Sequence, residues 1–404
     1  MQPGDHTPNY TSLTDVTLWA GKMMTSELRV ALFSGNYNYV RDGPTQALNR
    51  LVGYLLAQGA SVRVYAPTVA KPAFAPTGDL ISVPSFAVPG RSEYRVAMGL
   101  PAKLRRDLEG FAPNLVHVSA PDILGHRAVS WARGHDIPVV ASVHTRFETY
   151  LRYYGVGFLE PAAVALLRRF YRRCDAILPP SQSMVDLLRE QRMNGDIDIW
   201  SRGVDRTIFT PSARSLNWRR ELGIGDDEFV IGFLGRLVLE KGLDVFAAVI
   251  TELMARGVPH RVMVVGEGPA RDSFAQHVPT AVFAGFQEGA SLGRAVASMD
   301  VLFNPSVTET FGNVTLEAMA CAVPVVAAIA TGASSLVEDH VTGRLVDPSD
   351  IGGYADALAA YAQDRDLADT DGLAGEAKAG AFGWDAINQK VIDKYLAVLA
   401  RRGR

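Results

Sequence analysis

Two glutamates flank a small glycine turn in the stretch NPSVTETFGNVTLEAM. Glu309 comes before the turn, and Glu317 comes eight residues later in an otherwise apolar region. A glutamate near a helix N-terminus is common because its charge offsets the helix macrodipole, but this explains one of the two at most. A carboxylate also accepts hydrogen bonds strongly from hydroxyl groups. The pair therefore predicts a site for a ligand that carries several hydroxyl groups.

The turn between the glutamates is suited to a phosphate group. The strand-like stretch VLFNP ends at Pro305, and a helix is expected to begin near Gly312. The first N–H groups of a helix have no intrahelical partner and point toward the end of the preceding strand, where they bind anions. Glu317 then lies in the second turn, about 7 Å further along at ~1.5 Å per residue. The two carboxylates are thus spaced to reach hydroxyl groups on either side of a phosphate, as in a sugar–diphosphate–ribose.

Two cations follow another predicted strand, FVIGFLG. Arg236 comes directly after Gly235, and Lys241 lies a few residues further on. A guanidinium binds a pyrophosphate as a fork, and a lysine binds it as a point charge. Alone, this pattern is equally typical of a solvated loop. Beside the glutamate turn, it supplies the positive charge that a diphosphate requires.

The elements that would position these residues form two series. Apolar runs rich in β-branched residues, such as LRVALFSG and IPVVASVH, alternate with helical stretches, and after residue 210 the rhythm restarts with FVIGFLGRL, DVLFNPS and VPVVAA. Runs without polar alternation predict strands covered on both faces, as in a parallel sheet. Two βα series in one chain predict two doubly wound domains, whose ligands bind at the carboxyl ends of the strands.

The predicted boundaries follow from composition. The first domain is expected at 25–208 and the second at 209–383, because the polar stretch around Pro211 separates the two series. The amphipathic segment 384–404 has no following strand and is expected to pack back on the first domain. Residues 1–24 contain Asp5 and Asp15 and no early basic cluster, so they do not predict a signal peptide. They predict a disordered leader, or a start codon assigned too early, for which Met23 or Met24 would be the alternative start.

Composition excludes several classes of protein. At 404 residues the chain is too long for one ordinary core. Its net charge of −3 argues against nucleic acid as a partner. No apolar run reaches the roughly 18 residues of a membrane span, since Glu317 interrupts the best candidate. Cys174 and Cys321 are the two cysteines of the chain, and apolar stretches lie close to both in the sequence, which predicts buried, reduced thiols in a cytoplasmic protein.

Other motifs carry weaker signals. The stretch GEGPAR, with Gly266 and Gly268, lacks the third glycine of a dinucleotide fingerprint and is interpreted as a turn within the second domain. Without that fingerprint, a nicotinamide oxidoreductase is not indicated. Asp196 and Asp198 form a D-x-D in strand-like sequence, and the eight histidines show no ligand spacing, so no metal site is predicted.

Together, GRLVLEKGLD and the E-x7-E turn ETFGNVTLE resemble the motifs of the retaining glycosyltransferases of family 4, which have the GT-B fold. SVHTRFETYLRYYG, WSRGVDRTIFTP and VVGEGP extend the resemblance over most of the chain. HTRFETY and SRGVD are most similar to bacterial GDP-mannose-dependent α-mannosyltransferases and to sulfoquinovosyl- or glucosyl-diacylglycerol synthases. The resemblance implies an α/β protein with two Rossmann-like domains facing a cleft, the first on the acceptor side and the second holding the donor.

The resemblance also implies roles for individual residues. Arg236 and Lys241 would hold the donor diphosphate, Glu309 the hydroxyls of the donor sugar, and Glu317 the ribose hydroxyls. His144, at the end of the stretch PVVASVH, would face the donor sugar from across the cleft, although a loop histidine with only structural partners is the alternative. Further donor contacts are implied for Gly43, Gly235, Phe311, Gly312, Asn313 and Val314. Asp42 stands where many members have another glycine, so this sequence departs from the family pattern in the acceptor-side loop.

The implied function is transfer of a hexose from a nucleotide-diphosphate sugar to a lipid or glycan acceptor, with retention of configuration. GDP-mannose is the first choice of donor. A UDP-sugar-dependent glycolipid synthase (for glucose, glucuronate or sulfoquinovose) and, more remotely, a non-catalytic relative that binds sugar nucleotides are the alternatives. No cofactor and no obligatory metal are expected.

Two arginine-rich stretches bear on where the protein acts. ALLRRFYRRCD and GLPAKLRRDLEGF both lie in the first half of the chain. Clustered cations with apolar neighbours suit an anionic membrane surface, but an ordinary solvated helix face is equally consistent with the pattern. The expected location is therefore the cytoplasm, with peripheral contact to the inner face of the plasma membrane as an open possibility.

Overall fold

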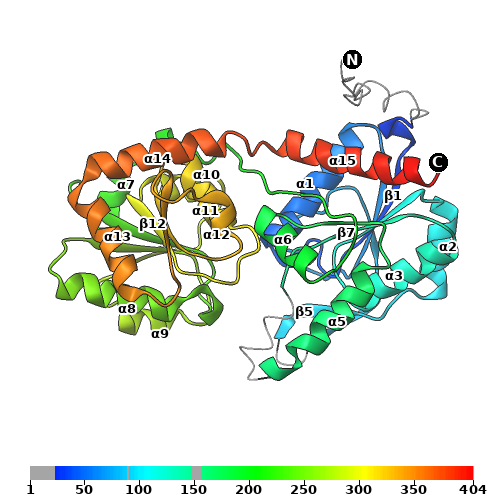
Figure 1. The fold of residues 1–404 in the computed structure, drawn as a ribbon, viewed down its shortest axis with the longest axis horizontal. Coiled ribbons are helices and arrows are strands. Elements are labelled where there is room, and N and C mark those ends of the chain that lie inside the picture. The colour runs from blue at the N-terminus through cyan, green and yellow to red at the C-terminus, as the bar shows by residue number, and fades with distance from the viewer. Residues whose placement is uncertain (1–22, 89–90, 147–155, 404) are drawn as a thin grey trace, which may run out of the picture.

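The computed structural model describes residues 23–88, 91–146 and 156–403. Two α/β domains lie side by side, each built on a parallel sheet with helices on both faces (Figure 1). The predicted leader, apart from Met23 and Met24, and the FETYLRYYG part of the motif after His144 lie outside the described residues.

The first sheet has six parallel strands, in the order expected for a Rossmann-type domain. The strand order reverses between β1 and β6, and this switch point is where doubly wound sheets bind their ligands. A short antiparallel hairpin, β4 (Ser85–Val88) and β5 (Arg91–Ala97), lies outside this sheet. In spatial order the six strands are β3 (Asp79–Ser82), β2 (Ser61–Ala66), β1 (Arg29–Phe33), β6 (Leu115–Val118), β7 (Val139–Ser142) and β8 (Ala176–Leu178).

The second sheet repeats this order, with its switch point between β9 and β12. Arg236 follows β9 and Glu309 follows β12, so the two predicted donor loops leave the same edge of the sheet. In spatial order the strands are β11 (Val282–Gly285), β10 (Arg261–Val265), β9 (Val230–Leu234), β12 (Val301–Asn304), β13 (Val325–Ala328) and β14 (Gly343–Val346).

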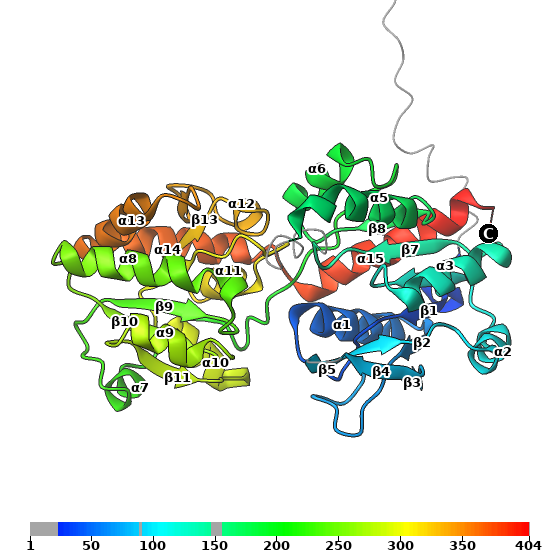
Figure 2. The same ribbon diagram turned by 90° about the horizontal axis from the view of Figure 1, so that it is seen from below.

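Helices cover both faces of each sheet (Figure 2). Those of the first half are α1 (Gly43–Ala57), α2 (Ala102–Phe111), α3 (Ile123–Gly134), α5 (Glu160–Tyr171) and α6 (Gln182–Glu190), with short 3-10 turns η2 (Thr25–Glu27) and η3 (Gly157–Leu159). Those of the second half are α7 (Leu216–Glu221), α8 (Leu243–Ala255), α9 (Arg271–His277), α10 (Gly289–Ala297), α11 (Asn313–Ala320), α12 (Ala333–Leu336), α13 (Ile351–Gln363) and α14 (Arg365–Ala379), with η4 (Pro211–Ala213) and η5 (Leu239–Lys241). Among the helices of the described ranges, none has both the length and the hydropathy of a bilayer-spanning segment.

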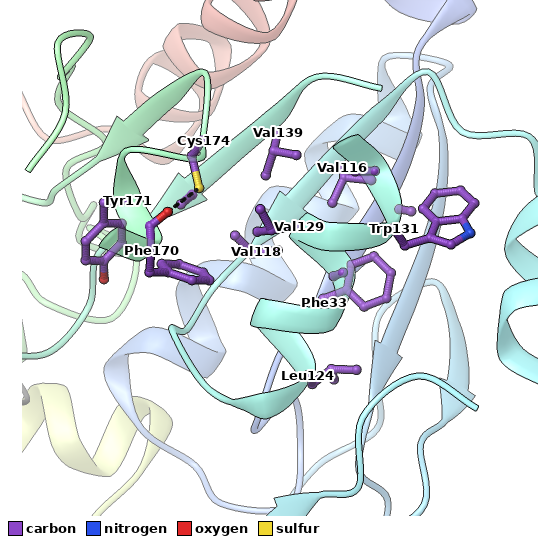
Figure 3. Packing of buried hydrophobic residues seen from close by; sticks show 14 of the residues in the cluster. Phe33, Val116, Val118, Leu124, Val129, Trp131, Val139, Phe170, Tyr171 and Cys174 are labelled. Atoms are coloured by element: carbon purple, nitrogen blue, oxygen red, sulfur yellow. Dashed lines mark hydrogen bonds between the residues drawn. The ribbon is translucent and has the colours of Figure 1, made fainter. Parts of the chain in front are cut away.

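One face of the first sheet packs against α2, α3, α5 and α6 in a dense apolar cluster. Figure 3 shows Phe33 and Val116 of the sheet facing Val129 and Trp131 of α3. Cys174 lies at the edge of this cluster, with its Sγ 3.8 Å from the carbonyl oxygen of Phe170. Burial raises the pKa of the Cys174 thiol to about 12. Both cysteines are free and buried, as predicted.

The last helix, α15 (Trp384–Arg401), runs from the second domain back to the first and lies beside α1 (Figures 1 and 2). The Tyr54 hydroxyl on α1 donates to Gln389 Oε1 at 3.0 Å. Asp196, of the D-x-D motif, accepts hydrogen bonds from Lys394 and Arg401 of α15. This carboxylate therefore fastens the C-terminal helix to the first domain.

Candidate active site

The glutamate turn lies where β12 ends and α11 begins, as the sequence predicts. Gly312 has a left-handed backbone, with φ of 92°, and N-caps α11, which begins at Asn313. This conformation favours glycine because a side chain would be strained there. The Glu309 carbonyl oxygen accepts a hydrogen bond from Thr331 Oγ1 at 2.8 Å, which ties the turn to the loop after β13. The N-terminal turn of α11 thus lies at the switch point of the second sheet.

Lys241 reaches this turn and forms an ion pair with it. Its Nζ lies 2.9 Å from Glu309 Oε1, and the two side chains are 28% and 11% exposed. Gly242 makes the approach possible, because a Cβ there would lie only 3.0 Å from the Pro305 carbonyl oxygen. Arg236 lies on the same loop with an exposed side chain. The structure therefore brings the predicted lysine and the first glutamate together.

The loop that carries the two cations packs against the loop after β10. A Cβ on Gly266 would lie 2.0 Å from the Gly235 carbonyl oxygen, and one on Gly268 would lie 2.3 Å from that of Leu237. The Leu237 amide also donates to the Glu267 carbonyl at 3.0 Å. The two glycines of GEGPAR thus allow two loops of the second domain to approach closely, in agreement with the turn inferred from the sequence.

Glu317 lies in the second turn of α11 and, within the described ranges, no hydrogen bond or ion pair is made by its carboxylate. Burial, and then the negative charge of Glu309, raise the pKa of the Glu317 carboxyl to about 8. The side chain nevertheless keeps some exposed surface. A carboxylate that is largely desolvated and has no partner costs free energy, and a ligand that donates hydroxyl groups would offset that cost.

The first domain contributes the N-terminus of α1 to the same region. Asp42 N-caps α1, and its carboxylate accepts from the Thr45 amide at 2.8 Å. Gly43 faces the other domain, because a Cβ there would lie 2.4 Å from Asn313 Nδ2 at the start of α11. The departure from the family pattern at Asp42 therefore serves the helix cap, while the predicted Gly43 lies against the predicted Asn313.

His144 also meets the glutamate turn, but through its backbone. Its carbonyl oxygen accepts from Thr310 Oγ1 at 2.9 Å, directly beside Glu309. Its ring nitrogens bond within the first domain, Nε2 to Ser142 Oγ at 2.8 Å and Nδ1 to Arg202 at 2.6 Å. Burial, and then the charges of Arg202 and His117, hold the pKa of His144 well below its usual range. The imidazole is therefore neutral at ordinary pH.

Two residues that the sequence analysis did not select also join the domains. Ser181 N-caps α6, and its hydroxyl donates to the Thr310 carbonyl oxygen at 2.8 Å. Ser183, on the same helix, donates to the Thr331 carbonyl. The stretch AILPPSQS places both serines just after β8, at the edge of the first sheet that holds His144. Their position directly after a predicted strand is the sequence feature that could have identified them as site residues.

Sequence models of two families match the chain: Glycosyltransferase Family 4 over residues 41–207 and Glycosyl transferases group 1 over residues 228–364. The chain is also 34% identical to a GDP-mannose-dependent alpha-mannosyltransferase of Mycolicibacterium smegmatis, over 93% of this chain and 99% of the relative. The chain belongs to glycosyltransferase family 4. Another relative, the sulfoquinovosyl transferase SQD2 of Arabidopsis thaliana, is 28% identical over 93% of this chain and 75% of its own length.

The fold agrees with this family assignment. The sucrose-phosphate synthase of Thermosynechococcus elongatus superposes with a TM-score of 0.76 at 20% identity, over 92% of this chain and 99% of that one. The GT-B fold that the resemblance implied is thereby confirmed. The protein is a glycosyltransferase of family 4 that uses a nucleotide-sugar donor.

Proposed function

We propose that this glycosyltransferase moves a mannosyl residue from GDP-mannose to a lipid or glycan acceptor, with retention of the anomeric configuration. The observation that carries the proposal is the arrangement at the start of α11. There the Lys241–Glu309 ion pair lies beside the N-terminal turn of α11, and Glu317 in the next turn makes no hydrogen bond or ion pair within the described ranges. The mannosyltransferase relative, 34% identical over nearly its full length, supports the choice of donor.

Donor binding would exchange partners at this site. The diphosphate takes the α11 amides together with Lys241 and Arg236, and Glu309, released from Lys241, takes the hydroxyls of the sugar. Glu317 takes the ribose hydroxyls. The C1–O bond to the diphosphate breaks, and the bond from C1 to the acceptor oxygen forms on the same face. The acceptor proton passes to the departing diphosphate oxygen, so no cofactor and no obligatory metal take part. Stabilising the charge on that leaving group is the main task of the cations.

A panel of nucleotide sugars tests the proposal. Purified protein is incubated with GDP-mannose, UDP-glucose, UDP-glucuronate and UDP-sulfoquinovose in excess EDTA, and slow hydrolysis of each donor is measured. We expect GDP-mannose to be consumed fastest. Preference for a UDP-sugar would instead support the glycolipid-synthase alternative, which the SQD2 relative favours. Hydrolysis of no donor would support a non-catalytic binding protein, and activity restored only by manganese would contradict the metal-free reaction.

The stereochemistry needs its own measurement. Proton NMR of the first product formed reports the configuration at C1 before mutarotation or further reaction. We expect the α configuration of the donor to be kept. Appearance of the β anomer as the first product would contradict a retaining reaction.

A lipid acceptor at a membrane surface is supported by the outer face of α5. Phe158 of η3 and Leu166 of α5 are 78% and 68% exposed, and Arg169 is exposed on the same side of the helix. An apolar face bordered by cations suits the interface of an anionic bilayer. We therefore place the enzyme in the cytoplasm, in peripheral contact with the inner face of the plasma membrane.

The other arginines of that stretch have structural partners. Arg168 Nε donates to the Gln191 carbonyl at 2.7 Å, and Arg172 Nε donates to the Arg192 carbonyl at 3.1 Å. Arg173 donates to Ser130 Oγ at 2.7 Å. The stretch therefore serves mainly to fasten α5 to its neighbours, and Arg169 is its best candidate for contact with phospholipid.

A further inference from the structure

A buried row of polar groups connects the C-terminal helix with the active site. Tyr395 of α15 hydrogen-bonds to His117 Nδ1 at 2.5 Å, and His117 Nε2 lies 2.9 Å from Ser142 Oγ. Ser142 in turn bonds to His144 Nε2, and His144 Nδ1 bonds to Arg202. We call these five residues the histidine row. The row joins β6, β7 and α15 to the loop that follows residue 200.

Hydrogen-bond donors and acceptors fix the tautomer of His144. Every N–H of a guanidinium is a donor, so His144 Nδ1 must accept from Arg202. The ring proton of neutral His144 therefore lies on Nε2 and is donated to Ser142 Oγ. Beyond Ser142, the bonds through His117 to the Tyr395 hydroxyl can run in either direction. The position of the ring proton is thus determined at the His144 end of the row. The bonds at the Tyr395 end hold His117 and Ser142 in place.

Packing keeps the row from rearranging. Arg202 is only 4% exposed and, in the described part of the chain, has no carboxylate partner; its other acceptors are the carbonyls of Trp200 and Ser201. The guanidinium lies 4.8 Å from the centre of the Trp200 ring. The same indole meets the rings of His117 and His144 edge-on, at centroid distances of 5.9 and 5.6 Å. Rotation of His144 would break two hydrogen bonds and disturb this packing.

We propose that Arg202, Ser142, His117 and Tyr395 are positioning residues, which hold His144 in the Nε2–H tautomer and keep its backbone against Thr310. The inference rests on the proposed function, because it takes the sugar to react beside Glu309 and His144. Thr310 accepts from Ser181 and donates to His144, so the position of His144 sets that of the residue next to Glu309. The C-terminal helix is therefore part of the active site, although Tyr395 itself does not contact the donor.

The decisive variant is Tyr395→Phe, which removes one hydroxyl and leaves the ring in place. Tyr54→Phe is the matched control, because it also removes a hydroxyl that joins α15 to the first domain, through Gln389, without touching the histidine row. We expect Tyr395→Phe to lower kcat for donor hydrolysis by about threefold to tenfold, the loss of one neutral hydrogen bond. The donor KM should stay unchanged, and Tyr54→Phe should match the wild type.

Substitutions at two further positions, Arg202 and Ser142, separate a positioning role from a folding defect. Arg202→Lys keeps the positive charge but loses the fork, so it should keep more activity than Arg202→Met. Ser142→Ala should lower kcat at least as much as Tyr395→Phe, because it interrupts the row next to His144. If Tyr395→Phe and Tyr54→Phe behave alike, or if the donor KM rises with kcat unchanged, the proposal is wrong.

A measurement without any donor separates this inference from the proposed function. Nitrogen-15 chemical shifts of the histidine rings, assigned with His144→Gln, report directly which ring nitrogen of His144 carries the proton. We expect the Nε2–H form in the wild type and in Tyr54→Phe, and a mixture of forms in Arg202→Met, which removes the donor to Nδ1. An Nδ1–H form in the wild type would overturn the proposal even if GDP-mannose is the donor. A wild type that hydrolyses no donor would overturn the proposed function, and the ring shifts would still decide the state of His144.

Discussion

The two sides of the interdomain site are built from opposite kinds of group. On the proposed donor side, the second domain presents the partly exposed Lys241–Glu309 ion pair and Glu317, whose carboxylate has no hydrogen bond or ion pair within the described residues. On the proposed acceptor side, the first domain presents the histidine row, whose neutral imidazoles are bonded to other protein groups. The charged groups of the donor side therefore need a ligand to complete their hydrogen bonds, whereas the imidazoles of the acceptor side are already bonded within the protein.

This difference should be visible in how stability depends on pH. The pKa of Glu317 is raised to about 8, so the folded protein binds this proton more tightly than the unfolded chain does, and its contribution to stability is lost as the pH rises. Burial lowers the pKa of His117 to about 3, so the folded protein resists a proton that the unfolded chain accepts below pH ~6.5. Its contribution is lost as the pH falls. The two sides of the site thus lose stability in opposite directions of pH.

The largest loss of activity is expected from substitution of the two cations on the donor side, Lys241 and Arg236. Lys241→Ala and Arg236→Ala should each lower kcat by about 10²–10³, because each removes a group that stabilises the departing diphosphate. Lys378→Ala is the control, since this lysine forms a longer ion pair with Glu338 in the same domain. Initial rates of transfer or donor hydrolysis measure the effect. Full activity of Lys241→Ala would mean that the lysine does not stabilise the departing diphosphate.

Substitution of the two glutamates should change different kinetic parameters. Glu309→Ala should mainly lower kcat, because its contact strengthens as the glycosidic bond stretches, and Glu317→Ala should mainly raise the donor KM, because ribose contacts are the same in ground and transition states. A hydrogen bond to a charged group predicts a change of about tenfold to a hundredfold in each case. Steady-state kinetics with varied donor separate the two parameters.

Thermal melting of the same two variants provides the control. Neither alanine substitution should unfold the domain, because the Glu317 carboxylate makes no hydrogen bond or ion pair within the described residues and loss of Glu309 leaves only a partly exposed lysine behind. If either variant melts far below the wild type while donor affinity per folded molecule is unchanged, the glutamate pair is structural. The contrast between the two sides of the site would then be lost.

Much of the donor side could be predicted from the sequence. The turn around Gly312, the helix after it and the position of Glu317 follow from local rules, namely that a glycine permits a left-handed cap and that parallel strands end at one edge. Lys241 and Glu309 lie far apart in sequence, yet both follow strands at the switch point, so their meeting could be anticipated from the fold class.

The acceptor side could not be predicted in the same way. The histidine row joins residues from four separate segments, and nothing in the local sequence around Tyr395 indicates that its hydroxyl reaches His117. Its members look like ordinary strand and helix residues, because the hydrogen bonds depend on how α15 docks on the sheet. The family resemblance identifies His144 as a candidate site residue. Its hydrogen bond to Arg202 can be recognised only in the tertiary structure.

The outer face of α5 is a third region, which can be compared with the two sides of the interdomain site. At low salt, Arg169→Gln should weaken binding to anionic phospholipid vesicles by about fivefold, as expected for one basic residue near the surface. The double variant Phe158→Ser, Leu166→Ser should weaken it about tenfold or more at any salt concentration, because it removes apolar burial. Arg220→Gln, on α7 of the second domain, is the control. If the wild type does not bind vesicles, the face is not a membrane surface.

The smallest effect concerns Glu317 in the absence of donor. Glu317→Gln keeps the shape of the side chain and removes its charge, so it should raise the melting temperature wherever the wild-type carboxyl is ionised in the unfolded chain. Below pH ~4 the glutamate is protonated in both states and the two proteins should melt together. Between there and pH 8 the difference should grow, and above pH 8 it should level off, since the folded carboxyl is then ionised as well. An unpartnered buried polar group costs about 1–3 kcal/mol, which corresponds to roughly 2–10 °C in a domain of this size. Glu338→Gln, whose carboxylate is well exposed, should show no such rise. Calorimetry from pH 4 to pH 9 measures the difference, and a constant offset across that range would mean that the Glu317 carboxylate is already satisfied before the donor binds.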